Sequence, residues 1–147
     1  MERRQLLKII GALAAAGMLP RAWAAEWNKA AFDMKTLPEA LRALGAQGAP
    51  ASDSITMTAP EIAENGAVVP VAVASRLPGT QSIALLVEKN PQPLAASFQI
   101  PAGTEPSVST RVKMAETSDV WAVVKTADGK TYAAKKEIKI TLGGCGG

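Results

Sequence analysis

The sequence predicts an all-β fold: an immunoglobulin-like antiparallel β-sandwich with a short N-terminal helix and a flexible C-terminal arm. About seven short runs of β-branched and apolar residues follow one another, and clusters of turn residues separate them. No helical pattern interrupts these runs, which argues against a parallel sheet with crossover helices. A β-barrel stays open as the alternative, because the same pattern fits a closed sheet.

The strand pattern is clearest where apolar and polar residues alternate. Along residues 107–114, the apolar Val108, Val112 and Met114 alternate with serine, arginine and lysine, as expected for a strand with one buried face. Asp128-Gly129 has the form of a two-residue hairpin turn, and Asn65-Gly66 also marks a turn. The expected strands are 54–58, 67–76, 82–89, 94–100, 107–114, 120–126 and 130–142.

Two segments are more apolar than a strand with one wet face requires. Residues 69–77 include the large apolar side chains of Val69, Val71, Val73 and Leu77 beside Pro70, and proline within a strand indicates an edge or a bulge. Residues 85–87 (Leu-Leu-Val) are apolar on both faces. Burial inside the sandwich and contact with a partner subunit are both open explanations. We expect the partner to contact the chain around residues 69–73.

The region before the strands predicts a short helix over about 37–46. Thr36 and Glu39 have the spacing of a capping box, and Pro38 suits the first helical turn. Leucine and alanine then recur at three- and four-residue spacing, which gives the helix one apolar side. The expected organisation is a helical segment at 25–49, the sandwich at 50–142 and the arm at 143–147. The helix is expected to cover a face or an open edge of the sandwich.

Residues 1–24 have the layout of a cleavable export signal. A basic start precedes an apolar run too short to span a bilayer, and cleavage is expected at Ala24 or Ala25. The adjacent Arg3 and Arg4 resemble a twin-arginine signal, although Leu6 stands where that motif usually has an aromatic residue. An ordinary secretory signal and a retained anchor are the alternatives. The expected location is the bacterial periplasm, with no stable membrane attachment.

Composition excludes several classes of function. Residues 1–24 account for the whole formal charge of +3. The rest of the chain is therefore neutral, and no nucleic-acid partner is expected. The chain has no histidine and one cysteine, which excludes a Cys/His pair, a Ser/His triad and a histidine-rich metal site within it. We expect no metal, no cofactor and no catalytic residue.

Polar side chains offer two weak candidates. Glu61 and Glu64 are carboxylates three residues apart, but nothing in the pattern predicts the buried cleft that acid–base chemistry needs. A solvated loop is the simpler interpretation. Lys135, Lys136 and Lys139 lie on the last expected strand, where they could attract a small anion or protect an edge strand; protection is the better interpretation.

The C-terminal sequence Gly-Gly-Cys-Gly-Gly at 143–147 is the strongest candidate site. Glycine adds backbone freedom and no bulk, so Cys145 is expected near the tip of a thin tether formed by Gly143, Gly144, Gly146 and Gly147. A lone thiol without a base is a poor catalyst, but another protein's narrow channel could admit it as a carried group. A functionless tail, an independent thiol enzyme and a disulfide-linked dimer through Cys145 are the alternatives.

Together with the segments 59–71, 87–91 and 109–115, this terminal motif resembles the SoxY family of sulfur carriers. The resemblance implies an immunoglobulin-like sandwich that pairs with SoxZ and works in periplasmic thiosulfate oxidation. It implies that Cys145 bears the sulfur intermediates while the neighbouring glycines form the swinging arm. Transient partners would be the haem protein SoxAX, the manganese enzyme SoxB and, where present, SoxCD.

Overall fold

The computed structural model describes residues 3–5, 8 and 27–143. The expected signal peptide and its cleavage site at Ala24 or Ala25 lie outside the described residues, apart from residues 3–5 and 8. Among the helices that the structure describes, none combines the length and the apolar character needed to span a bilayer.

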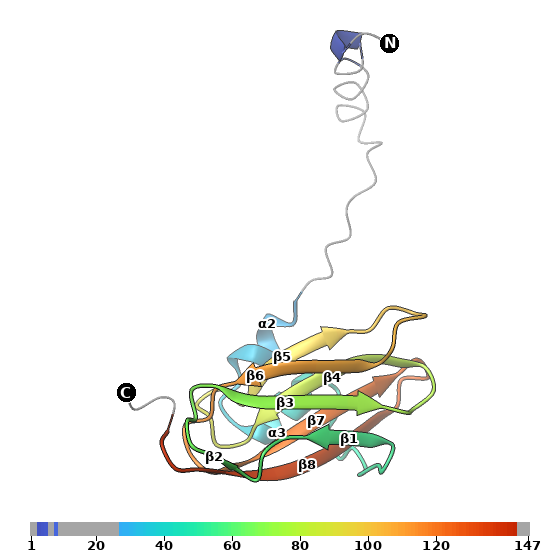
Figure 1. Cartoon of the computed structure of the whole chain (residues 1–147). Helices are drawn as coiled ribbons and strands as arrows, with labels where there is room; N and C mark the ends of the chain where they lie inside the picture. Colours follow the sequence, from blue (N-terminus) through green and yellow to red (C-terminus); the bar gives the residue numbers. More distant parts are fainter. Residues whose placement is uncertain (1–2, 6–7, 9–26, 144–147) are drawn as a thin grey trace.

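The described chain forms two β-sheets and a helical layer. The helices are α2 (Lys29–Asp33) and α3 (Leu37–Ala43). The strands are β1 (Ile55–Thr58), β2 (Ile62–Ala63), β3 (Val69–Ser75), β4 (Thr80–Val87), β5 (Leu94–Gln99), β6 (Ser107–Val112), β7 (Ser118–Thr126) and β8 (Thr131–Ile140). One sheet has the order β1-β3-β6 and the other β2-β8-β7-β4-β5 (Figure 1). The sheets remain separate, so the immunoglobulin-like sandwich is confirmed and the barrel alternative is wrong.

The pairing is antiparallel except at β2, which runs parallel to the end of β8. All expected strands are present, with ends that differ by a few residues. Two elements were not expected. The helix α2 is one short turn, and β2 has two residues, too few to show an alternating pattern.

Residues 85–87 are apolar on both faces because both faces of β4 are buried. Leu85 and Val87 belong to the core between the sheets, whereas Leu86 packs on the opposite side with residues of α2 and α3. The helices therefore cover the outer face of the larger sheet, as expected for the predicted helix. Figure 1 shows α3 behind the strands of this sheet.

The valines of residues 69–73 do not reach the surface, whereas Pro70 is exposed and Ala72 half-buried on the outer face of the smaller sheet. Val69, Val71 and Val73 point into the core and are at most 1% exposed, because β3 is the middle strand of the smaller sheet. The valine side chains are therefore out of a partner's reach, and contact with the outer face of β3 around Pro70 and Ala72 stays a prediction. Pro70 fits the rule for proline in a strand, since β1 reaches only to Ala72 and leaves β3 unpaired on that side at Pro70.

The predicted capping box at the start of α3 is confirmed. The Thr36 hydroxyl accepts from the Glu39 N–H, and the Glu39 carboxylate accepts from the Thr36 N–H at 3.2 Å. The helix ends at Ala43 rather than Ala46, because Gly45 adopts a positive φ of 69°. Ala40 is fully buried against the larger sheet.

The hairpin between β7 and β8 gives a pH-dependent prediction. The Thr126 hydroxyl and then the Lys130 N–H donate to Asp128, which lowers the pKa of this carboxyl below its ordinary value of 3.8. Ionised Asp128 therefore stabilises the fold above its unfolded pKa, and this contribution is lost as pH falls through the lower folded value. We expect Asp128→Asn to lower the melting temperature at pH 7, by a difference that shrinks below about pH 4. Melting curves of both proteins across this range test it, and a constant difference would contradict it.

Candidate functional site

The predicted arm leaves the sandwich at the end of β8, where two loops hold the chain. The Thr141 N–H donates to the Ala63 carbonyl at 3.2 Å, and the Leu142 carbonyl accepts from the Gly66 N–H at 2.8 Å. On the other side, the Ile140 N–H donates to the Thr117 hydroxyl at 2.9 Å. The final residues of β8 are therefore fixed between the β2–β3 and β6–β7 loops.

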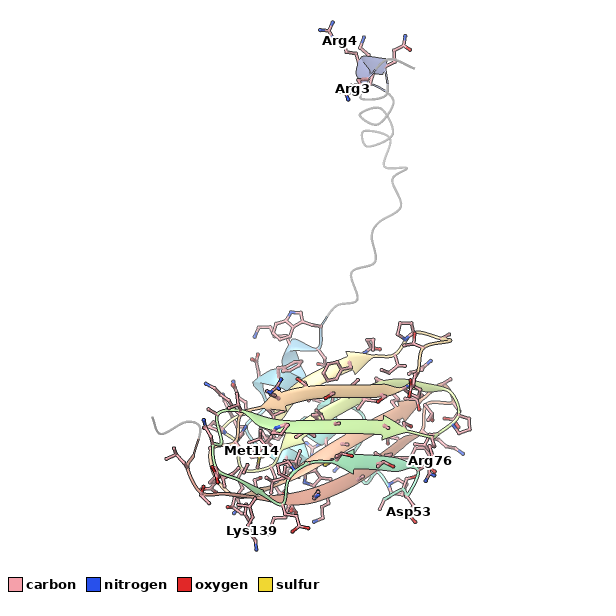
Figure 2. The ribbon with its side chains drawn as sticks, viewed as in Figure 1. Arg3, Arg4, Asp53, Arg76, Met114 and Lys139 are labelled. Atoms are coloured by element: carbon pink, nitrogen blue, oxygen red, sulfur yellow. The ribbon has the colours of Figure 1, made fainter. Side chains whose placement is uncertain are left out.

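Gly143 is the first residue of the predicted arm and the last described residue. Its backbone lies so close to the β6–β7 loop that a β-carbon built on it would stand 2.3 Å from the Ala115 carbonyl oxygen. Met114, the neighbour of Ala115, is fully buried, and its N–H donates to the Gly66 carbonyl at 2.7 Å. Figure 2 shows Met114 within the sandwich at the end from which the C-terminal segment leaves. Gly143 thus packs against the β6–β7 loop next to Met114, whose buried side chain anchors this loop in the core.

Asn90 holds the same loop from the β4–β5 turn. Its side-chain oxygen accepts from the Ala115 N–H at 2.9 Å, and its side-chain nitrogen donates to the Lys113 carbonyl at 2.7 Å. One amide therefore satisfies a backbone donor and a backbone acceptor at once. We call the set Asn90, Gly66, Leu142, Ala115 and Gly143 the exit clamp.

The Asn90 amide gives a prediction for stability. Asn90→Ala removes both hydrogen bonds and should lower the free energy of unfolding by about 1–3 kcal/mol. Asn90→Asp keeps the acceptor for the Ala115 N–H but loses the donor to Lys113, so it should cost less. Urea titrations of the three proteins at neutral pH would check this order. Equal stability of Asn90→Ala and wild type would contradict the role of the amide.

Apolar side chains are exposed beside the exit clamp. Leu142 is 66% exposed, and Ile62 and Val68, in or next to the β2–β3 loop, are 59% and 53% exposed. Ile62 pairs with Lys139 near the end of β8. The end of the sandwich from which residue 144 departs therefore presents apolar surface.

The structure places only part of the predicted site. Gly144, Cys145, Gly146 and Gly147 lie outside the described residues, so their roles stay predictions. Glu61 and Glu64 are both exposed and flank the short strand β2, consistent with solvated positions. Among the residues that the structure describes, no three acidic or cysteine side chains gather as a metal site would require.

The three lysines of β8 do not form one cluster. Lys135 pairs with Asp119 at 2.9 Å and lies 5.2 Å from the centre of the Trp121 ring. The bond with Asp119 raises the pKa of Lys135 above its usual value. Lys136 donates to the Ala59 carbonyl at 2.7 Å, and Lys139 points away from the sandwich (Figure 2). Lys136 and Lys139 line one hollow, but Glu61 and Glu137 line it as well and Lys135 does not, so the three lysines do not form an anion site.

Sequence reasoning missed the residues that hold the arm. Nothing in the local sequence indicates that the Asn90 side chain reaches the β6–β7 loop. Ala115 contributes only its backbone, which no sequence pattern identifies. These contacts depend on the register of strands that are distant in sequence.

The comparisons with known proteins concern the whole sandwich and its C-terminal segment. A family model described as "Sulfur oxidation protein SoxY" matches residues 41–145. The solved sulfur carrier protein SoxY from Chlorobium limicola f thiosulfatophilum is 40% identical, with a TM-score of 0.65, over 78% of this chain and 99% of that one. The search of curated proteins found no match.

More distant structures share the fold alone. A superoxide reductase (neelaredoxin) from Ignicoccus hospitalis is 19% identical, with a TM-score of 0.53, over 59% of this chain and 80% of that one. The superoxide reductase from Nanoarchaeum equitans is 14% identical, with a TM-score of 0.51, over 61% of this chain and 99% of that one.

The SoxY family model covers most of the chain, including every residue of the exit clamp, and extends to Cys145. The solved carrier agrees with this match in sequence and in fold. The chain therefore belongs to the SoxY family of sulfur oxidation proteins.

Proposed function

We propose that the chain carries thiosulfate-derived intermediates covalently on Cys145 and presents them to the enzymes of thiosulfate oxidation. The observation that carries this proposal is the position of the only thiol, two residues beyond the exit clamp. The family match includes this cysteine.

The reach of the thiol supports delivery to another protein. At about 3.3–3.6 Å per residue, the Cα of Cys145 extends at most about 7 Å from that of Gly143. An enzyme that receives Cys145 must therefore approach the end of the sandwich, where Ile62, Val68 and Leu142 are exposed. Small flanking glycines would let the thiol enter a narrow channel.

The chemistry falls to the partners because the chain offers the thiol no histidine base. In the first step a sulfur–sulfur bond would join the thiolate to thiosulfate, and the haem protein SoxAX would accept the two electrons released. SoxB then adds water across the terminal S–S bond, releasing sulfate and two protons and leaving a persulfide. SoxCD removes six electrons from the outer sulfur, with oxygen from three waters, and a second hydrolysis frees the thiol.

Assembly and location belong to the same proposal. The chain pairs with SoxZ as a heterodimer, meets SoxAX, SoxB and SoxCD transiently, and works in the periplasm. A twin-arginine signal would export it folded, and it needs no cofactor of its own. The alternatives are an independent periplasmic thiol enzyme and a structural sandwich with a functionless tail.

A reconstitution experiment separates carrier from enzyme. The purified chain alone should turn over neither thiosulfate nor peroxide. Thiosulfate oxidation should appear only when the chain is added back to a periplasmic extract from cells that lack it. Turnover by the isolated chain would support the thiol enzyme, and an extract that is fully active without the chain would contradict the carrier.

A further inference from the structure

We propose that Gly143 is a positioning residue: the fixed base from which residues 144–147 extend, rather than a moving part of the arm. The proposal rests on the proposed function, in which Cys145 must reach partner enzymes. Of the four glycines of the predicted arm, Gly143 would then serve to fix the start of the arm and not to make it flexible.

The need for glycine at position 143 is one of space. Gly143 is not among the glycines with positive φ, so its backbone conformation would suit any residue. A β-carbon there would lie 2.3 Å from the Ala115 carbonyl oxygen, far inside van der Waals contact. By contrast, a β-carbon on Gly45, Gly48, Gly103 or Gly129 would meet no heavy atom within 4 Å.

The Ala115 carbonyl is poorly able to yield to such a β-carbon. The Ala115 N–H donates to the Asn90 side-chain oxygen, and the Asn90 side-chain nitrogen donates to the Lys113 carbonyl, so the backbone around Ala115 is held in place. The preceding residue, Met114, is fully buried and hydrogen-bonded to Gly66, and Gly66 in turn donates to Leu142. These bonds join Leu142 at the end of β8 to the β2–β3 loop and that loop to the β6–β7 loop, whose Ala115 carbonyl lies against Gly143. A side chain at position 143 must therefore displace the end of β8 or break these bonds.

The consequence concerns where Cys145 can go. With Gly143 held, only Gly144 stands between the fixed point and Cys145, so the Cα of Cys145 cannot lie more than about 7 Å from that of Gly143. Release of Gly143 and Leu142 would roughly double the length of free chain and let the thiol spread along the sheet. The clamp thus limits the volume that the thiol samples, which raises its effective concentration near a docked partner.

A spin label on the only cysteine tests this directly. A nitroxide attached to Cys145 broadens amide resonances near it, and in wild type we expect strong broadening confined to residues 65–68 and 114–117. Gly143→Ala should weaken this broadening at least about twofold and extend it along β8. It should also speed hydrogen exchange of the Gly66 amide by about tenfold, because its bond to Leu142 loosens. Gly144→Ala, which adds the same methyl group one residue later, is the matched comparison and should change neither reading.

The outcomes distinguish this inference from the proposed function. An unchanged broadening pattern in Gly143→Ala, or equal changes in Gly143→Ala and Gly144→Ala, would overturn the fixed base. A residue that merely contributes stability would lower the melting temperature without moving the label. Loosening the loop by Asn90→Ala should make Gly143→Ala less costly than in wild type, and strict additivity would count against the contact. None of these readings needs sulfur chemistry, so they hold even if Cys145 carries no sulfur.

Discussion

Cells whose only copy of the chain carries Cys145→Ser should lose thiosulfate oxidation down to the background of a deletion strain. Serine is close in size but does not form the sulfur–sulfur bond on which the proposed cycle depends. The effect is all or none, because the chain contains no second thiol that could substitute. Oxygen uptake by whole cells supplied with thiosulfate measures it.

The same variant must fold normally for this result to count. Position 145 lies beyond the last strand, so far-ultraviolet circular dichroism and the melting temperature of Cys145→Ser should match wild type. Thiosulfate oxidation that persists in these cells at the wild-type rate would contradict the carrier interpretation and favour the structural sandwich.

Leu86→Ala should lower the free energy of unfolding by about 2–5 kcal/mol. Leu86 is fully buried on the helix-covered face of β4, where Ala31, Ala40 and Val123 belong to the same cluster. Truncation leaves a cavity between the sheet and the helical layer, which the short helices fill only in part. Equilibrium urea unfolding of purified protein gives the value.

A matched substitution on the uncovered sheet provides the control. Ser109 is exposed on β6 of the smaller sheet, and Ser109→Ala should change stability by less than about 0.5 kcal/mol. If Leu86→Ala were as harmless as Ser109→Ala, the helices would not be packed on the larger sheet as described.

The sequence predicted the sandwich well because its signals are local. Alternation along the strands and the Thr36–Glu39 capping box each act within a few residues. The turn at Asp128-Gly129 is where it was expected, but the two-residue form is wrong: the Thr126 N–H donates to the Lys130 carbonyl across three residues, and Gly129 has a positive φ whereas Asp128 does not. The doubly apolar segment at 85–87 also indicated two buried faces. The burial of the valines at 69–73 could not be told from contact with a partner, because an apolar strand in the middle of a sheet and one at an interface have the same composition.

The site was predictable only in its chemistry. The glycine-flanked Cys145 stands out in sequence, but the base of the arm depends on atoms that come together through tertiary structure. Composition assigned all four glycines to flexibility, whereas Gly143 lies against the Ala115 carbonyl. That contact requires the pairing of β8 with β2 and the Asn90 bridge, and neither follows from local pattern.

The most direct test of the carrier is the mass of its C-terminal peptide. Trypsin cleaves after Lys139 and releases residues 140–147, which contain Cys145. From cells oxidising thiosulfate, this peptide should carry added sulfane sulfur or a thiosulfonate group. The same peptide from cells grown without thiosulfate should not. An unmodified thiol under both conditions, with oxidation under way, would contradict the account.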